Sequence, residues 1–284
     1  MKKRSFWQQF SKNKGAVAGL VLLVVFVSIS LLAPLISPYD SDQVFDGQLR
    51  LAPVWSVAGT SEFLLGTDDI GRDVLSRLIY GARISLGVGF LVVILSLITG
   101  GIFGVLAGFY GGWVDIIIMR AVDVIMSLPS ILLAIVVVAI LGPNLINGII
   151  AVSIVALPGF IRIIRAAVMT EKSKLYMEAS RSFGASHFTQ IFKHIIPNCM
   201  APIIVQSTLG FSDGILNVAA LGFLGLGAQA PLPEWGVMLA DARHYIELSP
   251  WMVTLPGVCI LIVVLSFNIL GDGFRDAFDP KVDD

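Results

Sequence analysis

Charge is scarce in this sequence. Only 14% of the 284 residues are Asp, Glu, Lys or Arg, whereas 56% are hydrophobic, and the mean hydropathy is +0.87. Soluble globular domains carry about 25% charged residues. A chain of this length with so few charges cannot cover a water-exposed surface, so the composition predicts a membrane protein.

Residues that build common catalytic and metal sites are also scarce. Cys199 and Cys259 form no CxxC motif and the three histidines do not cluster, so neither a disulfide nor a metal site is expected. The sequence contains no GxxxxGK[ST] phosphate loop and no plausibly spaced Ser/His/Asp set. A net charge of −1 without a basic stripe argues against nucleic-acid binding. We therefore expect a non-catalytic chain that binds no cofactor itself and that contacts membrane lipids rather than nucleic acid.

Long apolar runs are what the sequence has instead. A helix needs about 20 apolar residues to cross a hydrocarbon core of about 30 Å. Six runs have this character, at about 16–36, 84–108, 117–141, 147–168, 200–224 and 251–271. The first is longer than a signal-peptide core and lacks a clear cleavage site, so we expect it to be retained as a span. The predicted fold class is an all-α membrane protein with six transmembrane helices.

The distribution of charge predicts the orientation. Five cations precede the first span and place the N-terminus in the cytoplasm: Lys2, Lys3, Arg4, Lys12 and Lys14. Six crossings return the C-terminus to the same side. The predicted organisation is a cytoplasmic segment 1–15, a first transmembrane helix 16–36, an extracytoplasmic loop 37–83 ending in an interfacial helix, a five-helix core 84–271 that includes a cytoplasmic loop 171–198, and a cytoplasmic tail 272–284.

Small and charged residues in the core spans predict how these helices pack. Gly100, Gly104 and Gly108 form a ridge at four-residue intervals that lets another helix approach closely. Arg120 and Asp123 lie three residues apart in span three, where we expect them to pair. The glycines and prolines over 222–236 predict that the helix of span five does not continue through this stretch.

The cytoplasmic loop begins with an amphipathic pattern. Leu175, Ala179 and Phe183 recur every four residues and give a short helix one apolar face. Gly184 follows, at the position where a helix commonly ends. The pattern predicts a helix that stops in a glycine turn.

A second short helix is predicted from Ser186, which can cap it. Its apolar face consists of Phe188, Ile191, Phe192 and Ile195, with Gln190 on the other side, and Pro197 is expected to end it. Two such short helices cannot bury a core of their own. Their apolar faces must lie on the membrane surface, as in a simple linker, or in a groove of another protein.

Span five carries polar residues on one helical face: Gln206, Gly210, Asp213 and Asn217. An aspartate in the middle of a membrane costs roughly 2.5–3.5 kcal/mol on insertion scales, so Asp213 should avoid lipid. Two interpretations stay open. The stripe lines a translocation path, or it is a helix contact in which Asp213 is hydrogen-bonded across the seam.

The cytoplasmic loop resembles the EAA loop of permease subunits in ABC-type importers. Glu178 and Ala179 are followed by Gly184 and then by Pro197 at the spacing of that motif, although Ser180 replaces its second alanine and His194 and Ile196 depart from its usual residues. In that family the loop is a coupling helix that docks into a cytoplasmic ATPase. The resemblance implies the same role for Tyr176, Glu178, Ala179, Ser180, Phe183, Gly184, Ala185, Phe188 and Pro197.

Three further stretches narrow the resemblance. "LGTDDIGRDVLSRLIYGARISL", "AALGFLGLGAQAPLPEWG" and "NILGDGFRDAFDP" are similar to C-type permeases of the dipeptide, oligopeptide and nickel importer group, closest to its dipeptide branch. This implies a type I importer (MetI-like) fold in the bacterial inner membrane. It also implies a second homologous permease, two cytoplasmic ATPase subunits that hold ATP and Mg, and an extracytoplasmic solute-binding protein.

The function therefore has a leading interpretation and two rivals. The leading one is a permease that forms, with a second permease, an ATP-driven path for di- or oligopeptides. The rivals are a proton-coupled secondary transporter that uses Asp213 and a structural scaffold. A cytoplasmic docking hairpin favours the first, because a self-contained secondary transporter has no motor to engage. The solute itself stays open among dipeptides, longer peptides, nickel chelates, glutathione and haem.

Overall fold

The computed structural model describes residues 6–278, which are mostly helical. In chain order the helices are α1 (Phe6–Phe10), α2 (Lys14–Leu31), α3 (Ala33–Ile36), α4 (Val74–Tyr110), α5 (Gly112–Met126), α6 (Ser130–Leu141), α7 (Leu145–Lys172), α8 (Leu175–Ser182), α9 (His187–Thr189), the π-helical turn η1 (Gln190–Ile195), α10 (Ile196–Asn198), α11 (Met200–Phe223), α12 (Trp235–Ala242), the 3₁₀ turn η2 (Arg243–Tyr245) and α13 (Trp251–Phe278).

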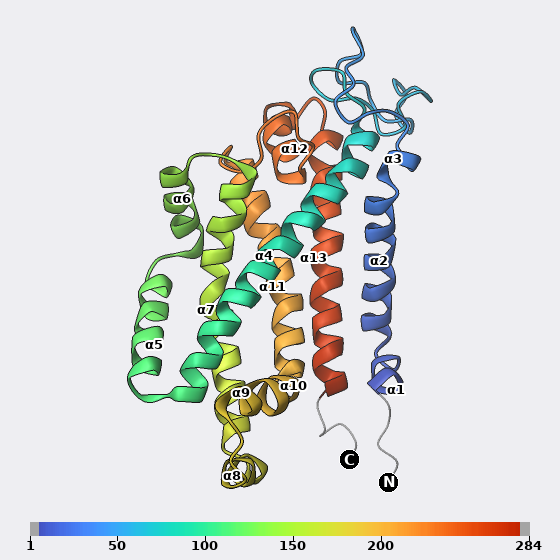
Figure 1. The fold of residues 1–284 in the computed structure, drawn as a ribbon. Coiled ribbons are helices and arrows are strands. Elements are labelled where there is room, and N and C mark those ends of the chain that lie inside the picture. Colours follow the sequence, from blue (N-terminus) through green and yellow to red (C-terminus); the bar gives the residue numbers. More distant parts are fainter. Residues whose placement is uncertain (1–5, 279–284) are drawn as a thin grey trace.

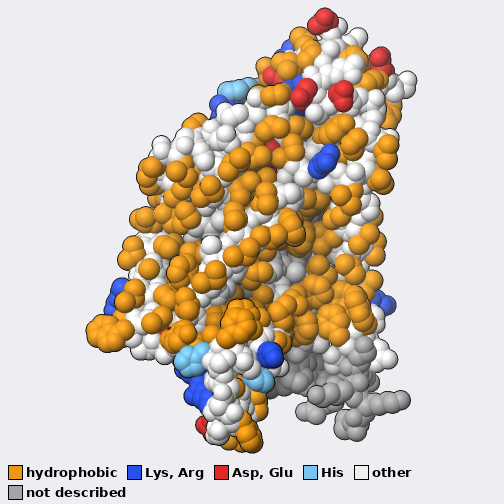
Figure 2. Space-filling model, in the orientation of Figure 1, with side chains coloured by type: hydrophobic (Ala, Val, Ile, Leu, Met, Phe, Trp, Pro, Cys, Tyr) orange, Lys and Arg blue, Asp and Glu red, His pale blue; other side chains and the backbone are white. Residues whose placement is uncertain are grey.

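The long apolar helices form one bundle. Five of them, α2, α4, α7, α11 and α13, are long and apolar enough to cross a membrane, and α5 with α6 makes a sixth crossing if this bent pair is one span. In Figure 1 the long helices lie side by side, with α4 running obliquely across them. Apolar side chains cover most of the flank seen in Figure 2, whereas the charged ones gather mainly toward its two ends. The predicted all-α membrane fold is confirmed.

The two ends of the bundle differ. The segment 37–73 lies with α12 at one end, and α8 to α10 project from the other (Figure 1). At this second end α1 packs on the last turns of α13, where the ring centroids of Phe6 and Phe278 are 4.9 Å apart. Residues 171–198, the loop predicted to be cytoplasmic, are called the hairpin below. The hairpin lies at the same end of the bundle as α1 and the last turns of α13, opposite the loop predicted to be extracytoplasmic.

The glycine ridge of α4 packs directly on α7. A Cβ atom added at Gly100 would lie 2.6 Å from the Phe160 Cβ, and one added at Gly104 would lie 2.9 Å from the Ile164 Cβ. Only hydrogen fits between the helices at these positions. Residue numbers rise in the same direction along both helices, because Gly100 faces Phe160 and Gly104 faces Ile164. The two helices therefore run parallel, toward the end of the bundle that carries α8 to α10.

Span three differs from its prediction as a single helix over 117–141. α5 and α6 are bent by 93° at a break between Met126 and Ser130. Pro129 explains the break, because its ring disfavours helical backbone at the preceding residue and removes an N–H donor. The sequence contained this signal, which the continuous apolar run obscured.

The helix predicted to lead into span two is present and is continuous with that span: α4 starts at Val74, capped by the Asp73 carboxylate, and runs unbroken through 37 residues. Another prediction was wrong, because Asp123 does not pair with Arg120. Its carboxylate accepts a 3.0 Å hydrogen bond from Arg162 of α7, because the side chain points toward the neighbouring helix.

Candidate functional site

The turn of the hairpin that was predicted to be cytoplasmic is a Schellman motif. The Ala185 N–H donates to the Ser180 carbonyl at 3.0 Å and the Gly184 N–H donates to the Arg181 carbonyl at 2.9 Å, which is the bond pair of this helix ending. Gly184 has a φ of +78°. That left-handed conformation strains residues with a Cβ, so the sequence requires glycine here for the backbone itself.

The apolar face of α8 points outward. Leu175 is 82% exposed and Phe183 is 91% exposed, while Met177 on the opposite side is fully buried. Glu178 and Ala179 are also exposed on this helix. An apolar helix face with a carboxylate beside it thus projects from the end of the molecule, where it can dock on another surface.

The second arm differs from its predicted face. It contains the π turn η1, and its apolar residues divide between two directions. Ile195 is fully buried, whereas Phe188 and Phe192 are 69% and 53% exposed with ring centroids 4.5 Å apart. The wider π turn breaks the regular helical spacing on which the prediction relied.

Gln190 reinforces the turn from inside, although the sequence pattern predicted it on the polar side. It is 2% exposed; its Nε2 donates to the Ala185 carbonyl at 2.8 Å and its Oε1 accepts from the Arg181 Nε at 3.3 Å. One buried amide therefore links the turn to both arms of the hairpin. A lone glutamine in a polar stretch gives no such signal in a sequence.

A hydrogen-bond network joins the base of the hairpin. The buried Glu171 carboxylate, at the end of α7, accepts from the Lys174 Nζ and the Tyr176 hydroxyl. Asn198 donates to that hydroxyl at 3.4 Å from the other arm. Burial and then the hydrogen bond to Glu171 raise the pKa of Tyr176 to about 12, so the phenol stays protonated and donates. The two arms are thus tied together where they meet α7 and α11.

Pro197 does not end the second arm. It occupies the start of α10, where a missing N–H is tolerated, and only Cys199 separates α10 from α11. The hairpin therefore continues almost directly into the helix that carries the polar stripe. Of the other predicted hairpin residues, Phe188 lies on α9. The rest lie on α8 or in the turn that follows it: Tyr176, Glu178, Ala179, Ser180, Phe183, Gly184 and Ala185.

The polar stripe of α11 lines a cleft of about 490 Å³ between α5, α6, α7 and α11, and all four predicted residues take part: Gln206, Gly210, Asp213 and Asn217. The break at Ser127–Pro129 borders the same cleft through Met126 and Ser130. Broken helix at membrane depth is tolerated where it is covered by protein or faces a watery cavity.

The Asp213 side chain is exposed to this cleft. Among residues 6–278 its carboxylate has no hydrogen-bond partner on another helix, and Asn217 Nδ2 donates to the Asp213 backbone carbonyl at 2.8 Å. Asp213 is therefore not held by a hydrogen bond to another helix in the described part of this chain. The stripe is free to face either a solute or a second subunit.

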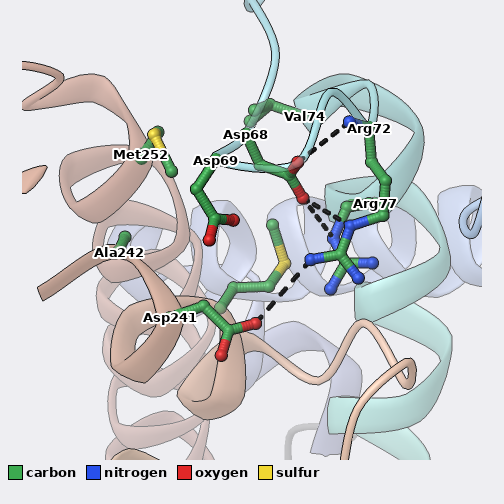
Figure 3. Close-up of a pocket in the computed structure, with 9 residues that line it drawn as sticks. Asp68, Asp69, Arg72, Val74, Arg77, Asp241, Ala242 and Met252 are labelled. Atoms are coloured by element: carbon green, nitrogen blue, oxygen red, sulfur yellow. Dashed lines mark hydrogen bonds and ion pairs between the residues drawn. The ribbon is translucent and has the colours of Figure 1, made fainter. Parts of the chain in front are cut away.

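A charge cluster at the opposite end of the molecule was missed by the sequence analysis (Figure 3). The Asp68 carboxylate accepts from the Arg72 Nε at 2.6 Å and lies 3.6 Å from the Arg77 Nε. Arg72 also reaches Asp241 of α12, with 3.8 Å between Nη2 and Oδ2. All three residues of the central group, Asp68, Arg72 and Arg77, are buried. The cluster joins segment 37–73, α4 and α12.

The fold and these features define a class, the membrane permeases of ABC importers. Residues 100–284 match the family of binding-protein-dependent transport system inner membrane components, and residues 3–53 match the N-terminal transmembrane domain of oligopeptide transport permease C. The chain belongs to the first family. It is therefore a multi-pass membrane protein and a subunit of a transport complex.

Curated relatives extend over nearly the whole chain. The chain is 53% identical to the di/tripeptide transport system permease protein DppC of Pseudomonas aeruginosa and 54% identical to the dipeptide transport system permease protein DppC of Escherichia coli K12, covering 98% of this chain and 92% and 93% of the relatives. It is 41% identical to the glutathione transport system permease protein GsiD of Pectobacterium atrosepticum, covering 98% of this chain and 91% of that relative.

A solved structure confirms the fold. The inward-facing MetNI methionine ABC transporter aligns with a TM-score of 0.58 and 19% identity, over 72% of this chain and 97% of that chain. The type I importer fold predicted from the sequence is thereby confirmed.

Proposed function

We propose that the chain carries di- or oligopeptides across the bacterial inner membrane, together with a second homologous permease. An extracytoplasmic binding protein delivers the solute, and two cytoplasmic ATPase subunits, which hold ATP and Mg, drive transport. The N- and C-termini lie in the cytoplasm. The observation that carries the proposal is the hairpin with its exposed apolar face. This face has the form of a docking element for an ATPase subunit, which would supply the ATP hydrolysis that this chain has no phosphate loop to perform.

The connections of the hairpin give it a mechanical role. Its first arm follows α7 and its second arm continues into α11, and the network of Glu171, Tyr176 and Asn198 ties the arms at their base. A displacement of the hairpin by a closing ATPase pair therefore passes to α7 and α11 together. Both helices line the cleft, so the displacement reaches the proposed path.

The cleft offers groups that suit a peptide. Asp213 accepts hydrogen bonds and attracts a peptide ammonium group, while the amides of Gln206 and Asn217 both donate and accept, as a peptide backbone requires. The proton-coupled alternative would need only Asp213. The kinship with ABC permeases and the projecting hairpin support the ATP-driven importer over it.

We expect Asp213→Asn to change peptide uptake without preventing assembly of the complex. The amide keeps the size of the carboxylate but replaces one acceptor oxygen with an NH2 donor and removes the negative charge, so a cationic group in the path loses its partner. Uptake of a labelled dipeptide and co-purification of the partner subunits measure the two effects. Loss of assembly in Asp213→Asn would instead indicate a contact between subunits, and unchanged uptake would remove Asp213 from the path.

We expect the purified chain alone to bind and hydrolyse no ATP, because it has no phosphate loop. ATPase activity should appear only when the cytoplasmic subunits are added. Phosphate release by the isolated chain, compared with preparations of the ATPase subunits alone, measures this. Vanadate-sensitive turnover that co-elutes with the isolated chain would contradict the assignment.

A further inference from the structure

A cationic cavity lies where α4 ends beside the hairpin. It has a volume of about 460 Å³ and is lined by Phe109, Tyr110, Lys172, Arg181, Ala185, His187 and Gln190. Lys172 and Arg181 are its charged residues, and no carboxylate lines it. Figure 2 shows basic and histidine side chains gathered at the hairpin end, directly below the apolar flank. We call this cavity the basic pocket.

Neither cation of the basic pocket forms a salt bridge in the described part of the chain, and both also line an adjoining cavity that contains Asp115 and Glu178. Lys172 Nζ donates to the Phe109 carbonyl and Arg181 Nε donates to Gln190, and within residues 6–278 neither cation has a carboxylate within 4.0 Å. Nearby cations do have such partners, as Arg165 has in Asp115. The basic pocket therefore offers positive charge and free donors to an external anion.

An apolar groove runs along the same two helices. It has a volume of about 270 Å³ and is lined by Leu95, Thr99 and Phe103 of α4 and by Ile150, Ser153, Ile154 and Leu157 of α7. Its two hydroxyl groups are satisfied within their own helices, since Thr99 donates to Leu95 at 2.6 Å and Ser153 to Ile149 at 2.7 Å. The groove thus presents hydrocarbon without an unmet polar group.

The groove and the basic pocket lie on the same helical faces. Phe103 and Tyr110 are separated by about two turns of α4, and Ile154 and Lys172 by about five turns of α7. Along α4 the near end of the groove, at Phe103, lies about 10 Å from Tyr110, whereas along α7 its near end, at Leu157, lies about 22 Å from Lys172. The groove therefore begins within the leaflet of about 15 Å next to the pocket and extends toward the bilayer midplane.

This face points away from the proposed path. On α7 the groove is lined by Ile154 and Leu157, whereas the cleft is lined by Ala156 and Gly159. Residues two positions apart differ by about 200° around a helix, so the groove and the cleft occupy opposite sides of α7. A contact with a second permease at the cleft therefore does not cover the groove.

We propose that the groove and the basic pocket bind one anionic phospholipid of the cytoplasmic leaflet. Lys172 and Arg181 hold its phosphate, and an acyl chain lies between α4 and α7. Because Arg181 also bonds Gln190 inside the hairpin, the headgroup stabilises the hairpin against the end of α4. This makes the coupling element sensitive to the charge of the surrounding membrane.

The test is lipid binding to the purified full-length chain, measured by native mass spectrometry. Dioleoyl phosphatidylglycerol, dioleoyl phosphatidylcholine and inorganic phosphate are titrated separately. One variant, Lys172→Gln with Arg181→Gln, removes both charges, and Thr99→Trp fills the groove. Lys193→Gln, an exposed cation of the same hairpin, and Ile102→Trp, an exposed apolar residue of α4 outside the groove, are the matched controls.

We expect phosphatidylglycerol to bind at least about tenfold more tightly than phosphatidylcholine, since each basic residue near a membrane surface contributes about 1 kcal/mol. The double variant should lose this preference, Thr99→Trp should weaken binding of both lipids, and both controls should behave as wild type. Equal affinity for the two lipids, or binding unchanged in the double variant, would overturn the proposal. Displacement of phosphatidylglycerol by inorganic phosphate, with Thr99→Trp silent, would show a free-anion site and would also overturn it.

Discussion

Gly184→Val is expected to lower ATP-driven uptake at least about tenfold while the chain still inserts in the membrane, because a left-handed residue with a side chain costs roughly 1–2 kcal/mol. A Cβ added at Gly184 meets nothing within 4 Å, so the cost is in the backbone and not in a clash. Relief of that strain turns α8 relative to the second arm, and the exposed face of α8 then no longer fits a partner groove. Uptake of a labelled peptide and the amount of ATPase retained on the purified complex measure the effect.

The matched control at this position is Gly184→Asn. Asparagine enters the left-handed region more readily than other residues with side chains, so this variant should retain most uptake. Glu178→Lys should reproduce the valine phenotype for a different reason, because it reverses the charge that faces the proposed partner. Normal uptake and normal ATPase retention in both Gly184→Val and Glu178→Lys would reduce the hairpin to an interfacial linker.

Asp68→Asn is expected to lower the free energy of unfolding of the region formed by segment 37–73 and α12 by about 3–5 kcal/mol, the range found when one partner of a buried ion pair is removed. The substitution leaves Arg72 and Arg77 buried with their main counter-ion gone, and Asp241, at 3.8 Å from Arg72, is too exposed to replace it. Segment 37–73 and α12 then lose their common attachment to α4. Thermal unfolding and hydrogen exchange of residues 67–73 measure the loss.

Asp69→Asn is the matched control in the same cluster. Burial and then the neighbouring Asp68 charge raise the pKa of Asp69, so its carboxylate is disfavoured in the folded protein. A raised carboxyl pKa means that stability is gained as the pH falls through that pKa and is lost as the pH rises. Asp69→Asn should therefore leave stability unchanged or raise it at neutral pH, with the gain disappearing in acid. Equal destabilisation by both substitutions would show that charge pairing is not what holds the cluster.

Some features of the hairpin could be predicted from the sequence and others could not. The helix–glycine–helix pattern was visible because a four-residue apolar spacing and a terminal glycine are local signals. The π turn was not, because the same residues fit an α-helical spacing equally well. The contacts of Gln190 with Ala185 and Arg181, and the link from Glu171 through Tyr176 to Asn198, depend on how the two arms fold together, which no local pattern contains.

Composition and local periodicity by themselves determined the membrane class, the long spans, the glycine ridge and the polar face of span five, since each depends only on residues adjacent along one helix. Pro129 signalled a break between α5 and α6 in the sequence, but only the tertiary structure set the angle of 93° between them. Tertiary structure alone also decided that Asp123 pairs with Arg162 and that the α11 stripe faces a cleft. It also brought Asp68, Arg72 and Arg77 against Asp241, across more than 160 residues of chain. Helices are fixed by their own hydrogen bonds, whereas the choice of neighbour depends on which side chains fill the space between them.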